Sequence, residues 1–144
     1  MPAVAISLKI PDNTAYTALV TLERLGVHVA RIERSEIWLF PGGENAAELV
    51  ARVRADESVF NPNKHRLSVL DRAAPRVGEV WIVPLLSLDT GPAAIAWRLF
   101  GDDGEPVERP VLDAAVECLL CNPAIDRAVT GDQPFDRDIL SKGE

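Results

Sequence analysis

Two cysteines and two histidines are the residues whose types could hold a metal or do redox chemistry. Cys118 and Cys121 form a C-x-x-C pair, and His28 and His65 would complete the four ligands of a zinc site. The pair lies in the apolar run CLLC at the C-terminal end of a predicted helix, whereas a helix N-terminus is what stabilises a reactive thiolate. Free cysteines often pack as small hydrophobes. We therefore expect core packing for both, with a metal site and a redox pair as the alternatives.

Two acidic motifs offer other chemistry. The string Leu88-Asp89-Thr90-Gly91 is found at the active site of retroviral-type aspartic proteases, where two such aspartates share a proton. Here the string leads into a predicted helix, so we interpret Asp89 as a helix cap. The loop 101–105, GDDGE, holds three carboxylates and could bind a hard cation, but it lacks the other ligands of a calcium loop and a solvated turn is the better interpretation.

Lys64, His65 and Arg66 are the best candidate contacts for an anion, because these basic side chains follow one another after the break at Asn61-Pro62. The alternative is the exposed start of a strand. The sequence has no nucleophile elbow, phosphate-binding loop or dinucleotide fingerprint. We therefore predict no catalytic, cofactor-binding or metal-binding residues, and no cofactor.

The composition indicates a globular chain and argues against several classes of function. The 144 residues are 47% hydrophobic and 26% charged, with a net charge of −7. Nucleic-acid binding requires clustered basic residues, and no apolar run approaches the roughly 20 residues that span a bilayer. The N-terminus alternates apolar and polar residues, unlike a signal peptide. We expect a cytoplasmic protein with no nucleic-acid or membrane partner.

The charge differs between the two halves of the chain. Residues 1–71 contain 8 basic and 9 acidic side chains, whereas residues 72–144 contain 7 basic and 13 acidic ones. The segment 72–78, RAAPRVG, has the composition of a connector between them. The asymmetry indicates that the two halves face different surroundings.

Hydrophobic periodicity predicts a β-α-β-β-α-β order for residues 1–71. The elements are a strand at 4–10, a helix at 13–25, a hairpin within 27–40, a helix at 46–56 and a strand at 65–70. The hairpin is predicted because the polar pair Arg34-Ser35 interrupts a β-branched and aromatic run. This order is typical of an α+β two-layer sandwich, a split βαβ (ferredoxin-like) unit with both helices on one face of an antiparallel sheet.

Residues 79–130 repeat part of this pattern. We expect a strand at 79–88, a helix at 92–100, a second helix at 111–121 and a strand at 125–130. Residues 131–144 are expected to form a loosely held tail.

Two Asn-Pro pairs indicate an internal duplication. Asn61-Pro62 recurs as Asn122-Pro123, and Asp12, at the start of the first helix, matches Asp89. The two Asn-Pro pairs are closer together than the two aspartates are, and the difference is about the length of the predicted hairpin. We therefore predict that residues 79–130 are a truncated copy that lacks the central hairpin. The alternative is chance similarity between short segments.

The first unit resembles the small PurS subunit of formylglycinamide ribonucleotide amidotransferase (phosphoribosylformylglycinamidine synthase). The matching stretches are VAISLKIPD, VHVARIERSEIWLF and FNPNKHRLSVL, and VECLLCNPAIDRAV in the second unit is similar to the family's ending. The Gly-Lys pair of the family's hairpin turn is Ser35-Glu36 here. The resemblance implies a non-catalytic assembly subunit that holds a glutaminase against a synthetase in purine biosynthesis, and a tandem chain would be a covalent pseudo-dimer.

Two predicted strands are apolar on both faces and therefore need cover on the face away from the helices. Their candidate interface residues are Ile37, Trp38, Phe40, Trp81 and Val83. Leaving both tryptophans in water would expose an unusually large apolar patch. The other unit, a second chain or both could cover them, and we predict a homodimer or a higher oligomer.

These patterns lead to two function hypotheses. The first is an assembly or scaffold protein of the PurS type, whose partners would be glutaminase and synthetase subunits. The second is a small-molecule-binding regulatory module with a ligand cleft at the interface between sheets, by analogy of fold alone. An enzyme that depends on His65 or Asp89 is the least favoured alternative.

Overall fold

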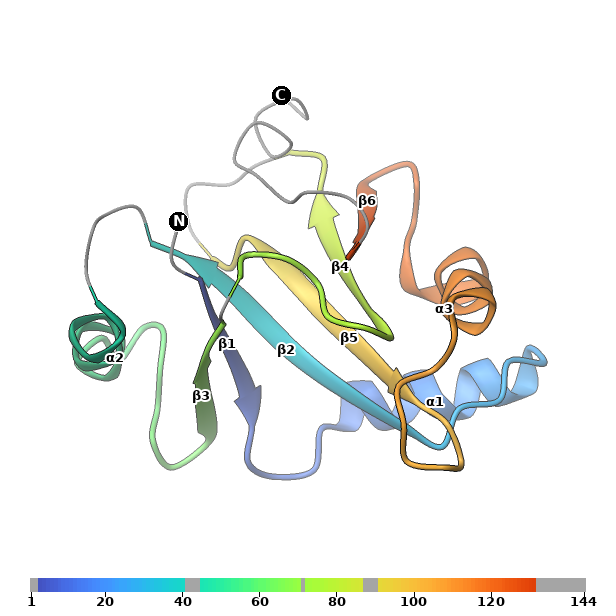
Figure 1. Cartoon of the computed structure of the whole chain (residues 1–144), viewed down its shortest axis with the longest axis horizontal. Helices are drawn as coiled ribbons and strands as arrows, with labels where there is room; N and C mark the ends of the chain where they lie inside the picture. Colours follow the sequence, from blue (N-terminus) through green and yellow to red (C-terminus); the bar gives the residue numbers. More distant parts are fainter. Residues whose placement is uncertain (1–2, 41–44, 71, 87–90, 132–144) are drawn as a thin grey trace.

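The described part of the chain, in a computed structural model, comprises residues 3–40, 45–70, 72–86 and 91–131. Its strands are β1 (Ala3–Leu8), β2 (Arg31–Leu39), β3 (His65–Val69), β4 (Glu79–Pro84), β5 (Ala94–Phe100) and β6 (Asp126–Thr130). Its helices are α1 (Asn13–Arg24), α2 (Ala46–Arg54) and α3 (Arg109–Ala115), and α3 continues into the π-helical segment η1 (Val116–Leu120). The strands pair antiparallel in the order β3-β1-β2-β5-β4-β6, which confirms the predicted α+β class (Figure 1).

Side-chain caps begin the two helices of the first half. Asp12 Oδ1 accepts hydrogen bonds from the backbone N–H groups of Thr14 and Ala15, at 2.9 and 3.1 Å. Asn45 Oδ1 accepts from Glu48 N at 2.9 Å, and the Glu48 carboxylate accepts from the Asn45 amide. Such caps satisfy donors that the first helical turn leaves without an intrahelical partner, so the polar residues before each apolar stripe set where α1 and α2 begin.

One face of the sheet packs against the helices. In β2, alternate residues point to this face, and of these Ile32 packs against the cluster that contains Leu22 of α1. Further along the same face of β2, Trp38 packs against the cluster that contains Leu49 of α2. The predicted arrangement of helices on one sheet face is therefore observed for α1 and α2.

Helix α1 belongs to the first half of the chain but also covers the second. Its Leu22 is fully buried in one cluster with Val80 of β4 and Leu99 of β5. Leu120 of η1 completes the same cluster. The second half has no helix between β4 and β5 among its described residues, and α1 fills that place.

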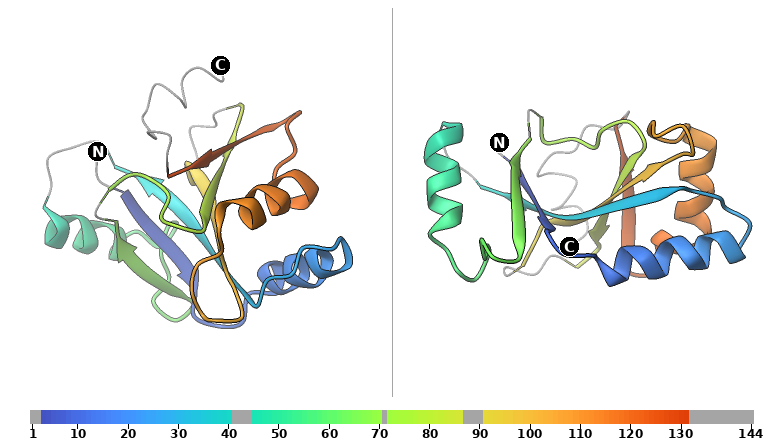
Figure 2. Two further views of the ribbon diagram at one scale, coloured as in Figure 1. Left: turned by 45° about the vertical axis from the view of Figure 1, so that its right-hand side comes forward. Right: turned by 90° about the horizontal axis from the view of Figure 1, so that it is seen from below.

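The opposite face of the sheet is also buried. Ile37, Trp81, Val83 and Ala94 form one cluster there, and each of them is at most 1% exposed. Leu70, which precedes the connector (residues 72–78), packs against this cluster. The connector crosses in front of β2 and β5 in Figure 1, and Figure 2 shows it on the side of the sheet away from α1.

The two halves of the sheet are related by an approximate two-fold arrangement. The order β3-β1-β2 in the first half is mirrored as β6-β4-β5 in the second, and β2 pairs with β5 at the centre. In the antiparallel register of β2 and β5, Glu36 lies across from Ile95, and the neighbouring cross-strand pairs are Ser35 with Ala96 and Ile37 with Ala94. The chain therefore places two three-stranded units side by side in one continuous sheet.

The two Asn-Pro turns have the same hydrogen bonds. Asn61 Oδ1 accepts from Asn63 N at 2.9 Å, and the Asn61 carbonyl accepts from His65 N at 2.8 Å. In the second turn, Asn122 Oδ1 accepts from Ala124 N at 3.1 Å and its carbonyl accepts from Asp126 N at 2.8 Å. Strands β3 and β6 follow these turns at the same distance along the chain and have the same length, so the two segments correspond in backbone path.

Two predicted elements are wrong. The segment 27–40 contains no hairpin, because Arg34 and Ser35 lie within β2, where they pair with Trp97 and Ala96. Residues 92–100 do not form a helix, and β5 occupies most of this segment. A strand between two neighbours gains hydrogen bonds on both sides, and this tertiary pairing overrides local helix propensity.

These corrections change the form of the repeat. The predicted order β-α-β-β-α-β is observed as β-α-β-α-β in the first half. Among the described residues of the second half, a counterpart of α1 is missing, whereas the prediction was a missing hairpin. Val4 pairs with Val69, and Val80 pairs with Thr130. By this register, Val4 in the first half corresponds to Val80 in the second. The predicted match of Asp12 to Asp89 would instead make Val4 correspond to Trp81.

Candidate functional site: an arginine-lined cavity

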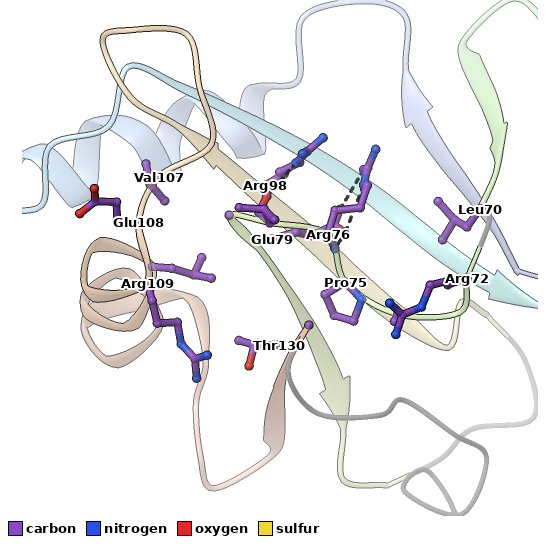
Figure 3. Close-up of a pocket in the computed structure, with 15 residues that line it drawn as sticks. Leu70, Arg72, Pro75, Arg76, Glu79, Arg98, Val107, Glu108, Arg109 and Thr130 are labelled. Carbon is purple, nitrogen blue, oxygen red and sulfur yellow. Dashed lines mark hydrogen bonds and ion pairs between the residues drawn. The ribbon is translucent and has the colours of Figure 1, made fainter.

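A cavity of about 650 Å³ lies where the connector, the first turn of α3 and the end of β6 meet (Figure 3). Its apolar wall is formed by Leu70, Ala74, Pro75, Val77, Val107 and Leu112. Its charged lining residues are Arg72, Arg76, Arg98, Arg109, Glu79 and Glu108. Four arginines thus line one cavity in a chain whose net charge is −7.

Two glycines allow the backbone to close around this cavity. Gly78 has φ +73°, and a Cβ built there would lie 2.7 Å from Pro106 Cβ. A Cβ on Gly131 would lie 2.8 Å from the Pro75 carbonyl oxygen. Because real side chains do not approach so closely, both of these positions in the cavity lining require glycine.

An ion pair between a half-exposed arginine and a buried carboxylate ties the connector to β4. Glu79 is 2% exposed, and its Oε2 lies 2.9 Å from Arg76 Nη2. Glu79 Oε1 accepts a hydrogen bond from the Arg76 backbone N–H at 2.8 Å. The hydrogen bond that Arg76 donates to Glu79 raises the pKa of Arg76, against the effect of burial. A buried carboxylate without such partners would be strongly destabilising, so this pair fixes the connector against the sheet.

Arg98 lies between two acidic residues on neighbouring strands. It pairs across the sheet with Glu33 of β2 and with Glu79 of β4. Its Nε donates to the Val77 carbonyl oxygen at 3.1 Å, and its guanidinium lies 5.2 Å from the centre of the Phe100 ring. These contacts hold the stem of Arg98 under the connector.

Arg72 and Arg109 approach the cavity from two sides. Figure 3 shows the Arg72 guanidinium directed toward Pro75 and the Arg109 side chain extending toward Thr130, whereas the head groups of Arg76 and Arg98 point away from Thr130. Arg109 Nε donates to Asp113 Oδ1 at 2.8 Å. A guanidinium carries further N–H donors that suit carboxylate and phosphate oxygens.

The predicted anion contacts do not converge on one site. His65 and Arg66 are neighbours in β3, so their side chains point to opposite faces of the sheet. His65 Nδ1 accepts a hydrogen bond from Asn61 N at 2.9 Å, and its ring lies 6.0 Å from that of Phe60. Lys64 is exposed in the preceding turn. His65 therefore stabilises the Asn-Pro turn.

The cysteines differ in their surroundings. Cys118 is exposed in η1, so core packing is wrong for this residue. Cys121 packs at the edge of the α1–α3 core, where burial and then the charge of Asp126 raise the pKa of its thiol. The described residues contain no group of three or more histidine, cysteine and acidic side chains that could hold a metal.

The acidic loop 101–105 is a hydrogen-bonded turn. Gly101 N donates to the Glu105 carbonyl oxygen at 2.9 Å, and Asp103 Oδ1 accepts from Glu105 N at 3.0 Å. Asp102 lies 3.0 Å from His28 Nε2, and Glu23 lies 2.8 Å from His28 Nδ1. These contacts raise the pKa of His28 to about 9, with the hydrogen bond to the Asp102 carboxylate as the largest cause.

The helix that Asp89 was expected to cap is not observed, because residues 94–100 form β5. Leu88, Asp89 and Thr90 themselves lie outside the described residues.

The expected interface residues are covered within one chain. Ile37, Trp81 and Val83 are at most 1% exposed on the connector side of the sheet. Trp38 and Phe40 are half-buried on the other side, in the cluster beneath α2. Apolar residues on both strand faces were correctly expected to need cover, but these five side chains do not form one exposed surface.

The cavity was missed because its arginines are far apart in the sequence. A signal existed in residues 72–144, where four of seven basic residues prove to line this one site. Two of them, Arg72 and Arg76, belong to the short connector. Their convergence depends on the path of the connector across the sheet, which no local pattern encodes.

None of the helices in the described ranges is long and apolar enough to cross a membrane. No protein-family model, curated protein or solved structure matches the chain.

Proposed function

We propose that the chain is a small-molecule-binding module whose ligand occupies the arginine-lined cavity. The observation that carries this proposal is a cavity of about 650 Å³ whose lining includes four arginines, with the Arg72 and Arg109 side chains approaching it from two sides. Ligand sites in proteins are concave, are mostly apolar in lining and commonly measure about 300–1,000 Å³. The mixed lining of apolar side chains and a few charged groups fits this description.

The packing of the connector supports a preformed site. The Arg76–Glu79 pair ties the connector to β4, and the backbone approaches closely at Gly78 and Gly131 in the lining. A site of this kind loses little conformational entropy when a ligand enters, and less lost entropy favours affinity.

A thermal-shift screen of small metabolites tests the proposal. A compound present at about 100 times its Kd should stabilise the fold by about 2.7 kcal/mol and raise the Tm by several degrees. Val77 lines the cavity but is 74% exposed, so Val77→Trp should obstruct the site at small cost to the core. Leu86, 75% exposed and outside the cavity lining, provides the matched control Leu86→Trp.

The outcomes separate binding in the cavity from binding elsewhere. The proposal expects stabilisation in the wild type and in Leu86→Trp, and its loss in Val77→Trp. Equal stabilisation of all three proteins would place the ligand at another site and overturn the proposal.

An assembly role of the PurS type is the second candidate. It is supported by the two-fold arrangement of three-stranded units about the β2–β5 pair, which corresponds to the covalent pseudo-dimer that the resemblance implies. Co-purification with a glutaminase and a synthetase subunit, together with light scattering for the predicted homodimer, tests it. A monomer that retains neither enzyme would contradict this role.

A further inference from the structure

We propose that strand β3 is a docking edge for an extended, acidic segment of another protein, which adds to the six-stranded sheet as a further strand. This proposal does not depend on the ligand site proposed above. It rests on three features of β3: backbone groups without partners, basic side chains on one side of the strand, and apolar side chains on the other.

The backbone of β3 presents unpaired groups at the edge of the sheet. β3 is an outermost strand and pairs only with β1 (Figure 1). Leu70 N donates to the Ala3 carbonyl oxygen, which fixes the alternation of the β1–β3 ladder. By this alternation the N–H and C=O groups of Leu67 and Val69 point away from β1, and no described residue bonds to them. A chain that lies antiparallel to β3 can pair with these groups.

The other edge strand, β6, is a poorer docking site for an acidic segment. Thr130 of β6 occupies the place that Val69 has in β3, and it already has a further interaction. Asp126 at the start of β6 would repel an acidic partner. We therefore assign the docking site to β3.

The strand pair at this edge is basic although the chain is acidic overall. Lys64 and Arg66 are exposed and lie two residues apart, on the connector side of the sheet, and the backbone N–H of Lys9 bonds to Lys64 across the β1–β3 pair. No acidic residue occurs in segments 1–11 and 58–70. Because exposed charges act over about 8 Å at physiological salt, these local charges decide the interaction with a strand at the edge. Acidic side chains on the connector side of the partner strand would therefore be favoured.

The helix side of the same edge is apolar. Leu67 packs against the cluster beneath α2, and Val69, on the same side of β3, is 37% exposed. A partner strand would place apolar residues on this side and acidic residues on the other, so its sequence alternates between the two. A second copy of the chain fits less well, because it would bring an equally basic edge against this one.

A short peptide of this pattern tests the proposal. The probe is an acetylated and amidated heptapeptide of alternating glutamate and valine, titrated into the isotope-labelled full chain. We expect saturable NMR shifts of the Leu67 and Val69 backbone N–H groups at millimolar peptide, with a lower affinity at higher salt. A peptide with lysine in place of each glutamate should bind at least about five-fold more weakly, because its charges face Lys64 and Arg66.

N-methylation of the probe tests whether it pairs as a strand. In an antiparallel pair, valines on the helix side direct their N–H groups toward β3, whereas the glutamates direct theirs toward solvent. Methyl groups on the valine nitrogens should therefore weaken binding about ten-fold, because donors are lost and close pairing is blocked. Methyl groups on the glutamate nitrogens provide the matched control and should have little effect.

Variants of the chain locate the contacts. Val69→Pro removes an outward N–H but no bond to β1, so it should weaken binding of the glutamate peptide about five-fold. Val69→Thr keeps this N–H and is the matched control. Arg66→Glu should lower the affinity for the glutamate peptide and raise the affinity for the lysine peptide, whereas Arg24→Glu, an exposed change on α1, should do neither. Because Arg66→Glu leaves the backbone unchanged, it tests the edge even if Val69→Pro does not fold.

The outcomes bear on separate parts of the proposal. Equal binding of the glutamate and lysine peptides would overturn the acidic partner, and equal binding of the valine-methylated probe would overturn strand pairing. Shifts of Leu67 and Val69 that depend on protein concentration alone, with light scattering of a dimer, would assign the edge to a second copy and overturn the proposal. The absence of shifts with every probe would also overturn it. The metabolite screen decides the ligand site separately.

Discussion

His28 shows at the scale of one residue how the acidic surface of the chain is used. Its imidazole joins Glu23 at the end of α1 to Asp102 in the loop after β5. Both carboxylates favour the protonated ring, so the pKa of His28 is raised from 6.5 to about 9. Two segments that are far apart in sequence are thereby connected by one titratable side chain.

The protonation of His28 predicts a pH-dependent contribution to stability. Because the pKa is higher in the folded than in the unfolded chain, the contribution is complete below about pH 6.5 and is lost as the pH rises through about 9. Asp102→Asn should lower the pKa of His28 in an NMR titration, and should lower the Tm more at pH 6 than at pH 9.5. Glu57→Gln, an exposed change elsewhere, should do neither; an unchanged His28 pKa in Asp102→Asn would contradict the arrangement.

The two Asn-Pro turns carry the similarity between the halves at the scale of elements. Each asparagine accepts a hydrogen bond from the backbone N–H two residues later and leads the chain from a helix into an edge strand. Such side-chain turns offer the backbone a defined alternative to continuing the helix. The recurrence of the pair was visible in the sequence because this function depends on local chemistry.

Equivalent turns predict equivalent losses on mutation. Asn61→Ala and Asn122→Ala should each lower the free energy of unfolding by about 1 kcal/mol, the usual worth of one hydrogen bond. The turns are in opposite edges of the sheet, so the double variant should lose about the sum of the two. Urea denaturation measures these values, and a negligible loss at Asn122 alone would show that only the first turn is structurally important.

Local chemistry explains which elements were predicted correctly. The helix caps Asp12 and Asn45 and the two Asn-Pro turns depend on contacts within a few residues. The helices that these caps begin and the edge strands that follow these turns were predicted near their observed positions. Strands β2 and β5 were misassigned because Arg34-Ser35 resembles a turn and Pro92 resembles a helix start. Both assignments were decided by the central β2–β5 pairing, which joins residues far apart in the sequence.

The cavity could not be predicted for the same reason. Arg72, Arg76, Arg98 and Arg109 come from three separate segments, and only the folded connector brings them together. Periodicity reports which face of an element is buried, but it carries no information on how a loop crosses a sheet. The expectation of a ligand cleft was therefore general, whereas its position and charge required the three-dimensional structure.

At the scale of the whole molecule, the β2–β5 pair makes one folding unit of two halves. The core shared by Leu22 and Leu99 crosses the boundary between them on the helix side, and Ile37 and Trp81 cross it on the other. Only the cluster beneath α2 is built from one half alone. Neither half buries all of its apolar surface by itself, because the other two clusters take residues from each half.

A single cooperative unfolding transition is the expected consequence. Native-state hydrogen exchange should give the same maximal free energy of opening for amides of β1 and of β4, which are the central strands of the two halves. Ser35→Pro, which removes a backbone donor at the centre of the sheet, should lower both values together. Lower protection of β4 with β1 unchanged would show that the halves unfold separately.

The sharing of α1 also has a consequence for the chain during its synthesis. Leu22 and Leu99 belong to the same core cluster, and Leu99 follows Leu22 in the sequence by more than half the length of the chain. At about 5–20 residues per second, roughly 4–15 seconds pass between the emergence of these two residues from a ribosome. For that interval the apolar stripe of α1 has only its partners from the first half, such as Val29 and Ile32, and the part that packs against β4 and β5 depends on transient contacts or on a chaperone to keep it from associating with other chains.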